Sequence, residues 1–116
     1  MSLINRCGMI TFPLQPVFDW QNKIFPDDPI SIDGDPFGHE NGTIYLIPEM
    51  ETFEQFEKWI QKNYKVFFEE LLFGWCTDES LWPAKRNHKM FREWFHVSFQ
   101  PMVFDTLNIS LKHDED

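Results

Sequence analysis

The sequence is poor in the residues that mark several common classes of protein. Its 116 residues include only two cysteines, Cys7 and Cys76, which are far apart and form no C-x-x-C pair. A thiol redox pair is therefore not indicated, and we expect both thiols to be free. No apolar run approaches the roughly 20 residues of a membrane span, and the N-terminus lacks the pattern of a secretory leader. We expect a cytoplasmic protein with no membrane partner.

Basic residues are also scarce. The chain has 10 Lys and Arg against 19 Asp and Glu, which gives a formal net charge of -9. An acidic chain repels the phosphates of nucleic acids and anionic membranes, so neither is an expected partner. The same charge favours association with a basic protein, because opposite charges accelerate diffusional encounter.

The motifs that carry common chemistry are absent as well. The sequence has no G-x-G-x-x-G, Walker loop, G-x-S-x-G or H-E-x-x-H. The Asp33-Gly34-Asp35 stretch begins like a calcium loop, but later positions of that loop are occupied by residues unable to bind the ion. We expect no metal and no cofactor. We favour a non-enzymatic function and assign no catalytic residue.

Aromatic residues, in contrast, are abundant. They make up 17% of the chain, with 13 Phe and 5 Trp. Rings bury a large area each, so most are expected in the core. A single small core does not need so many, and an exposed aromatic patch would favour a homodimer or another protein partner.

The turn and strand signals indicate one domain over residues 1–116. Residues 1–42 are rich in Pro, Gly and Asp and are expected to be irregular, apart from a possible short strand at 9–14. Pro13 and Pro16 lack the N–H that a ladder needs, so they would place this strand at a sheet edge or break it. Residues 43–47 read TIYLI, a β-strand pattern. Further strands are predicted in 97–104 and 106–111, which complete a core over 43–111, and residues 112–116 are a solvated tail.

Two helices are predicted between these strands. The first runs from Phe53 to about Phe73, with a capping box at Thr52 and Gln55 and a stop at Gly74. The second begins at Pro83 and places Phe91, Trp94 and Phe95 on an apolar face. The order of elements predicts an α+β fold, with two consecutive helices on one face of a small, mostly antiparallel sheet.

The second predicted helix carries the only positively charged block of the chain. Residues 83–104 hold four basic side chains and one acidic one. The candidate binding residues there are Trp82, Lys85, Arg86, His88, Lys89 and Arg92. An ordinary solvated helix face explains the basic residues as well, and Trp82 suits either a plug for the helical layer or an interface anchor.

The acidic counterpart is the loop that contains Asp27, Asp28, Asp33 and Asp35. Together these features predict a protein-interaction module that binds a partner or itself. One version is an inhibitor or immunity-type protein whose acidic surface covers a basic active site, with Asp33 and Asp35 at the contact.

Two alternatives stay open from the sequence alone. The first is a small-ligand binder or enzyme, whose site would be assembled from His39, Glu40, Arg86, His88 and Arg92 around a pocket lined by Trp82 and Trp94. The second is the docking of phosphate or nucleic acid on residues 85–92, which would be strongly salt-dependent.

Overall fold

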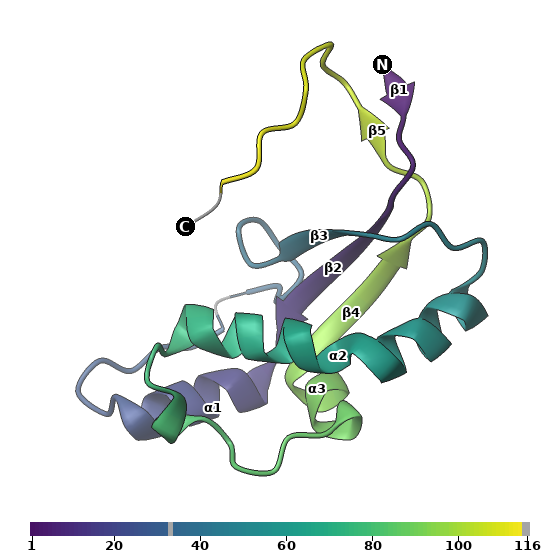
Figure 1. The fold of residues 1–116 in the computed structure, drawn as a ribbon. Coiled ribbons are helices and arrows are strands. Elements are labelled where there is room, and N and C mark those ends of the chain that lie inside the picture. Colours follow the sequence, from purple (N-terminus) through teal and green to yellow (C-terminus); the bar gives the residue numbers. More distant parts are fainter. Residues whose placement is uncertain (33, 115–116) are drawn as a thin grey trace.

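The computed structural model describes residues 1–32 and 34–114, and within them it contains two small antiparallel sheets (Figure 1). The main sheet has three strands in the order β3-β2-β4. These are Thr43–Ile47 (β3), Cys7–Pro13 (β2) and Phe95–Gln100 (β4). The second sheet is a ladder of two residues in each strand, between Ser2–Leu3 (β1) and Phe104–Asp105 (β5).

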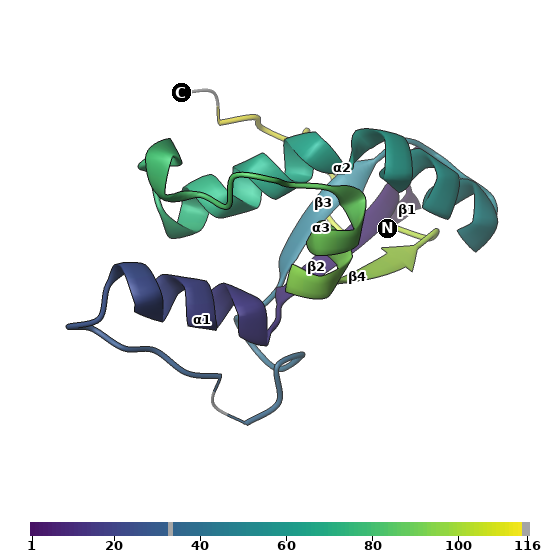
Figure 2. The same ribbon diagram turned by 90° about the horizontal axis from the view of Figure 1, so that it is seen from below.

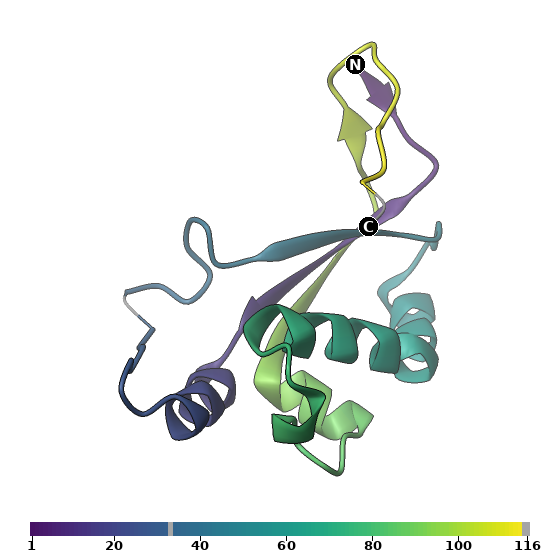
Figure 3. The same cartoon turned by 60° about the vertical axis from the view of Figure 1, so that its left-hand side comes forward.

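Three α-helices accompany these sheets in the described residues. They are Gln15–Ile24 (α1), Phe53–Trp75 (α2) and His88–Trp94 (α3), with a 3-10 turn, η1, at Glu79–Leu81. Figure 3 shows α2 and α3 against the same side of the three-stranded sheet. The predicted α+β class is confirmed, and so is the pair of helices on a small antiparallel sheet.

The core lies between that side of the sheet and the helices. Alternation along β2 turns Cys7, Met9 and Thr11 inward, and each is buried. Rings fill the space opposite them: Phe56 and Phe68 from α2, Phe91 from α3 and Phe95 from β4 are all buried. Phe68 contacts Phe91 and Phe95 at centroid distances of 5.5 and 6.1 Å. A large share of the aromatic excess therefore builds the core.

Helix α1 is a correction to the sequence prediction, which left residues 1–42 irregular. Pro16 stands at the start of the helix, where proline is tolerated because the first backbone N–H groups have no partner inside the helix. Pro13 is the last residue of β2. The strand predicted at 9–14 is therefore real, but it is the central strand of the sheet and not an edge.

The capping box that starts α2 is confirmed. The Thr52 side chain accepts a hydrogen bond from Gln55 N at 3.1 Å, and Gln55 Oε1 accepts from Thr52 N at 3.3 Å. The predicted stop at Gly74 is wrong by one residue, since α2 continues to Trp75. The Cys76 N–H then donates to Leu72 O and closes the last turn.

The start of the second predicted helix is also corrected. It begins at His88 and not at Pro83, because Asn87 supplies the N-cap by accepting a hydrogen bond from Met90 N at 2.8 Å. Two of the four basic residues, Lys85 and Arg86, therefore lie in the connection before α3.

The C-terminal prediction is only partly right. Strand β4 ends before Pro101, which lacks the N–H that a ladder needs, and β5 is short. The strand predicted at 106–111 is wrong, since residues 106–111 pair with no other strand in the described part of the chain.

Candidate functional site

The connection between α2 and α3 is held in one conformation by its own hydrogen bonds. The Trp82 Nε1–H donates to the carbonyl of Cys76 at 2.8 Å, which folds the connection back on itself. Asp78 caps η1 by accepting from Ser80 N at 3.0 Å and from Ser80 Oγ at 2.6 Å. These hydrogen bonds lower the pKa of Asp78. The Trp82 ring is thus carried on an ordered support.

Two more tryptophans reach the same place from distant parts of the chain. Trp20 comes from α1, and its Nε1–H donates to Leu81 O at 2.9 Å. Trp94 comes from α3, and its ring lies 5.6 Å from that of Trp20, with an angle of 47° between the planes. Trp94 also rests on the buried Phe68, with 6.1 Å between centroids. Helices α1 and α3 and the connection are therefore joined through Trp20 and Trp94.

The three rings line an open groove, which we call the tryptophan groove. Its other apolar lining comes from Pro16, Leu81 and Pro83. Only two charged residues, Asp19 and Lys23, take part, and the volume is about 390 Å³. The indole N–H groups of Trp20 and Trp82 already donate inside the protein, so their faces are what the groove offers. Such a surface suits an apolar or aromatic side chain, and tryptophan is among the commonest hot-spot residues of interfaces.

Both arginines of the basic segment are paired within the protein. Arg92 Nη1 lies 3.0 Å from each carboxylate oxygen of Glu57 on α2. Arg86 lies 3.6 Å from Glu69, donates to Pro83 O at 2.7 Å and has its guanidinium 5.6 Å from the centre of the Trp82 ring. Lys85 and Lys89 are exposed. The basic segment therefore acts largely as a bridge to α2.

His88 lies between α3 and α2. Its ring meets that of Tyr64 edge-on, with 5.6 Å between centroids, and its Nε2 atom is buried without a hydrogen-bond partner in the described residues. Burial lowers the pKa of His88 first, and the positive charge of Arg92 lowers it further, whereas Glu57 acts in the opposite sense. The neutral imidazole is therefore the form that the fold favours.

The acidic loop is separate from the tryptophan groove. Asp35 Oδ1 accepts a hydrogen bond from Phe37 N at 2.9 Å, a turn typical of aspartate, while Asp33 lies outside the described residues. Asp27 and Asp28 are exposed beyond the end of α1. Figure 2 shows this loop running past α1, away from α3.

The small-ligand or enzyme hypothesis needs five polar residues to meet around Trp82 and Trp94, and they do not meet at the groove. Trp82 and Trp94 do line a common surface, as that hypothesis requires. None of the five polar candidates lines it: His39 and Glu40 are exposed in the acidic loop, and Arg86, His88 and Arg92 face α2.

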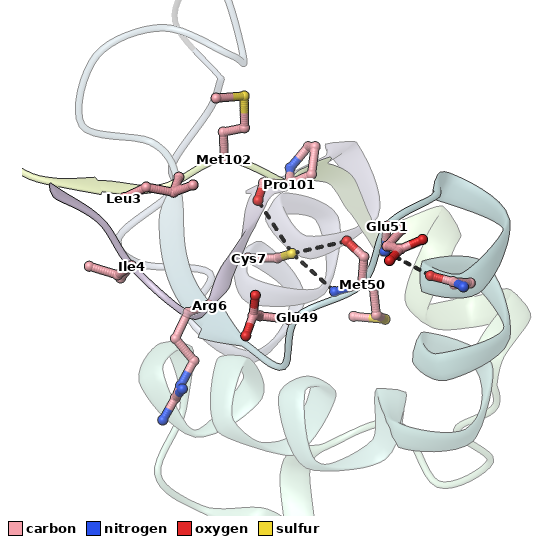
Figure 4. A pocket seen from close by; sticks show the side chains of 10 residues that line it. Leu3, Ile4, Arg6, Cys7, Glu49, Met50, Glu51, Pro101 and Met102 are labelled. Carbon is pink, nitrogen blue, oxygen red and sulfur yellow. Dashed lines mark hydrogen bonds between the residues drawn. The ribbon is translucent and has the colours of Figure 1, made fainter.

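A second hollow, of about 490 Å³, lies at the other end of β2 (Figure 4). Cys7 lies at its base, where its single S–H has two carbonyl acceptors within reach, Met50 O at 3.4 Å and Pro101 O at 3.5 Å. The Cys7 Sγ also accepts from Met50 N at 3.3 Å. Since Cys7 is 2% exposed, its thiol is a structural anchor for the connection between β3 and α2.

Sequence reasoning missed Trp20 and Pro16, which belong to the unpredicted helix α1. The available signal was the spacing of Val17, Trp20, Gln21 and Ile24 after a proline, which is typical of a short amphipathic helix.

In the part of the chain that the structure describes, no group of three or more His, Cys, Asp and Glu side chains is arranged to hold a metal ion. No helix formed by the described residues is long and apolar enough to cross a membrane. Comparisons with protein-family models, with curated proteins and with solved structures find no match to this chain.

Proposed function

We propose that this protein is a non-enzymatic protein-interaction module that uses the tryptophan groove to hold an apolar or aromatic side chain of a protein partner. The observation that carries the proposal is the convergence of Trp20, Trp82 and Trp94 on one open surface. Their indoles are fixed by hydrogen bonds and ring contacts, so little side-chain entropy is lost when a partner docks.

The net charge of -9 supports a partner with a basic surface around its apolar anchor. Asp19 lies in the groove, and Asp27 and Asp28 lie beyond the end of the same helix. This arrangement agrees with an inhibitor or immunity-type role, in which negative charge steers the encounter and the groove holds the complex. Cys7 and Cys76 are both free and buried, in keeping with the reducing cytoplasm as the location.

The docking of phosphate or nucleic acid on residues 85–92 is the weaker alternative. Both arginines of that segment are paired with carboxylates of α2, so the contact would depend on Lys85 and Lys89. Binding of a phosphate polymer through two lysines would be weak and would fall steeply with salt.

The test is affinity capture with a variant that blocks the groove. Leu81 lines the groove and is exposed, so Leu81→Asp places a charge there without disturbing the core. Val66→Asp is the matched control, because Val66 is exposed on α2, outside the groove. We expect a stoichiometric protein partner whose affinity falls at least about tenfold with Leu81→Asp and is kept by Val66→Asp. Equal binding by both variants would refute the role of the groove.

A further inference from the structure

Exposed large hydrophobic side chains gather along the outer side of β3, on the paired strands β1 and β5, and on the segment that follows β5. We call this region the charge-poor end and define it as residues 1–12, 43–48 and 101–111. It contains only Arg6 and Asp105 of the chain's 10 basic and 19 acidic residues. Its exposed large side chains include Leu3, Ile44, Leu46, Met102, Phe104, Leu107 and Leu111.

Part of this end is a short arm. Strands β1 and β5 pair through Ser2 with Asp105 and Leu3 with Phe104, and Ile4 N donates to Val103 O at 2.9 Å. Figures 1 and 3 show the arm standing clear of the helices and of the three-stranded sheet. A ladder of this length has little stability by itself, so the arm gains from an additional surface that covers it.

The rest of this end is the uncovered side of β3. This strand is at the edge of the sheet, and its alternation turns Tyr45 and Ile47 toward the core and Ile44 and Leu46 to the other side. Ile44 is 70% exposed and Leu46 is 46% exposed. Leu46 also lines a hollow of about 230 Å³ together with Phe104, Leu107 and Leu111. The apolar surface is therefore continuous from β3 to the arm and the segment after it.

The size of this surface matches one side of a stable interface. The seven large side chains are between 46% and 70% exposed. A fully exposed side chain of this kind offers roughly 100 Å² of apolar area, so together they offer roughly 400 Å². A stable interface buries about 800 Å² on each partner, of which somewhat more than half is apolar, or roughly 450 Å².

Charge favours a second copy of this chain as the occupant. Two copies of net charge -9 repel each other across most of their surface, and the repulsion is weakest where carboxylates are few. The charge-poor end contributes one carboxylate, Asp105, and is bordered by Glu49 and Glu51 at the hollow that Leu3 and Met102 line. A basic partner would be attracted more strongly to the acidic remainder of the molecule than to this end. The two charges that are present have opposite signs, and Arg6 forms no ion pair with a described residue. A two-fold axis can therefore place Arg6 of one copy beside Asp105 of the other.

We propose that the charge-poor end is the interface of a two-fold homodimer of this chain. The inference is independent of the tryptophan groove, because no residue lines both the groove and the hollow beside the arm. Figure 1 shows β1 and β5 beyond one end of β2 and α1 beyond the other. The dimer would present two grooves at its outer ends, which suits a partner that is itself repeated or dimeric.

The first part of the test measures the mass of the full chain by sedimentation equilibrium between about 1 and 100 μM. We expect twice the chain mass of 14.0 kDa, and a monomer throughout this range would overturn the proposal. In the double variant Ile44→Lys with Leu46→Lys, we expect a dissociation constant at least tenfold higher. The matched control is Val66→Lys with Phe73→Lys, which makes the same change of charge at exposed positions of α2 and should stay dimeric.

Equal masses for the two double variants would also overturn the proposal, because the dimer would then use another surface. Where the strand variant fails to fold, as judged by circular dichroism, Phe104→Lys with Leu107→Lys tests the same interface from the arm. The charge pair gives a further check. Arg6→Glu and Asp105→Arg should each weaken the dimer, and the two together should restore it, whereas additive loss would overturn the two-fold arrangement.

Discussion

The two ends of the central strand β2 carry two different kinds of apolar surface. At the end that leads into α1, tryptophan rings are fixed by hydrogen bonds to backbone carbonyls and rest on the buried Phe68. At the other end, mostly aliphatic side chains project from short strands and from the segment after them. The first surface is preorganised for one side chain of a partner, whereas the second includes a two-residue ladder that gains stability when another surface covers it.

This difference also shows where the aromatic excess is used. Phenylalanines build the core, tryptophans line the groove, and the exposed charge-poor end depends largely on Leu, Ile and Met. Self-association through an aromatic patch, as expected from composition, stays a prediction. If the chain dimerises at the charge-poor end, aliphatic residues will provide most of the contact.

The largest expected effect compares how firmly the two ends of β2 are packed. Phe68→Ala removes a buried ring that touches Trp94 and should lower the free energy of unfolding by about 3–5 kcal/mol. Phe104→Ala in the arm removes a half-exposed ring and should cost less than about 1 kcal/mol in the monomer. Urea unfolding at a concentration that favours the monomer measures both, and similar losses would show that the arm is as firmly supported as the groove.

A smaller effect tests the local structure beside the groove. Asn87→Ala removes the N-cap of α3 and should cost about 1 kcal/mol. Pro83→Ala should cost less, because Pro83 precedes the helix and contributes only to the groove. Urea unfolding of the two variants gives the comparison. A larger loss of stability for Pro83→Ala than for Asn87→Ala would contradict the assignment of Asn87 as the N-cap that starts α3.

The pH dependence of stability reports on the contact between α2 and α3. The pKa of His88 in the folded protein lies below its ordinary value of 6.5, so the unfolded chain takes up a proton first as the pH falls. Stability should therefore decrease as the pH falls below about 6.5, toward the lower folded pKa. The groups facing His88 are Tyr64, Arg92 and Glu57, and none is changed in His88→Gln.

Thermal unfolding between pH 5 and pH 8 measures this dependence. The Gln variant should show a flatter profile than the wild type over that range. An unchanged profile would mean that other groups, such as the carboxylates, dominate the pH response.

The smallest effect concerns Tyr45 on β3, whose strand neighbours Ile44 and Leu46 are exposed side chains of the charge-poor end. Burial, with a further contribution from Glu70, raises the pKa of Tyr45 to about 12. Its stabilising contribution is complete below pH 10 and is lost as the pH rises toward 12. Ultraviolet titration of wild type and Tyr45→Phe isolates this phenol, and ionisation near pH 10 would contradict the burial of Tyr45.

The elements that sequence predicted well are those with local signals. The Thr52 and Gln55 capping box and the repeat of Phe56 and Ile60 define α2 without help from the rest of the chain. Helix α1 was missed because Pro16, like Pro13, was interpreted as a residue that limits a strand, although Pro16 occupies a position where a helix tolerates it. A preferred N-cap residue, Asn87, was available to place the start of α3.

The groove itself could not be predicted from local patterns. Trp20 contacts Leu81 across 61 positions of sequence, and Trp94 joins them from a third element. Only the packing of α1 against α3 brings these rings together. Likewise, the sequence did not reveal the ion pairs of the basic segment. Glu57 and Glu69 reach Arg92 and Arg86 only after α2 and α3 have packed.

The most direct test of the account is the mass, by light scattering, of the complex with the captured partner. The account predicts a complex with two copies of this chain and two groove-bound anchors of the partner. Ile44→Lys with Leu46→Lys should reduce it to one copy that still binds, and Leu81→Asp should leave a dimer that does not bind. A single variant that abolishes both dimerisation and partner binding in a folded protein would contradict the account, because the two ends would then form one surface.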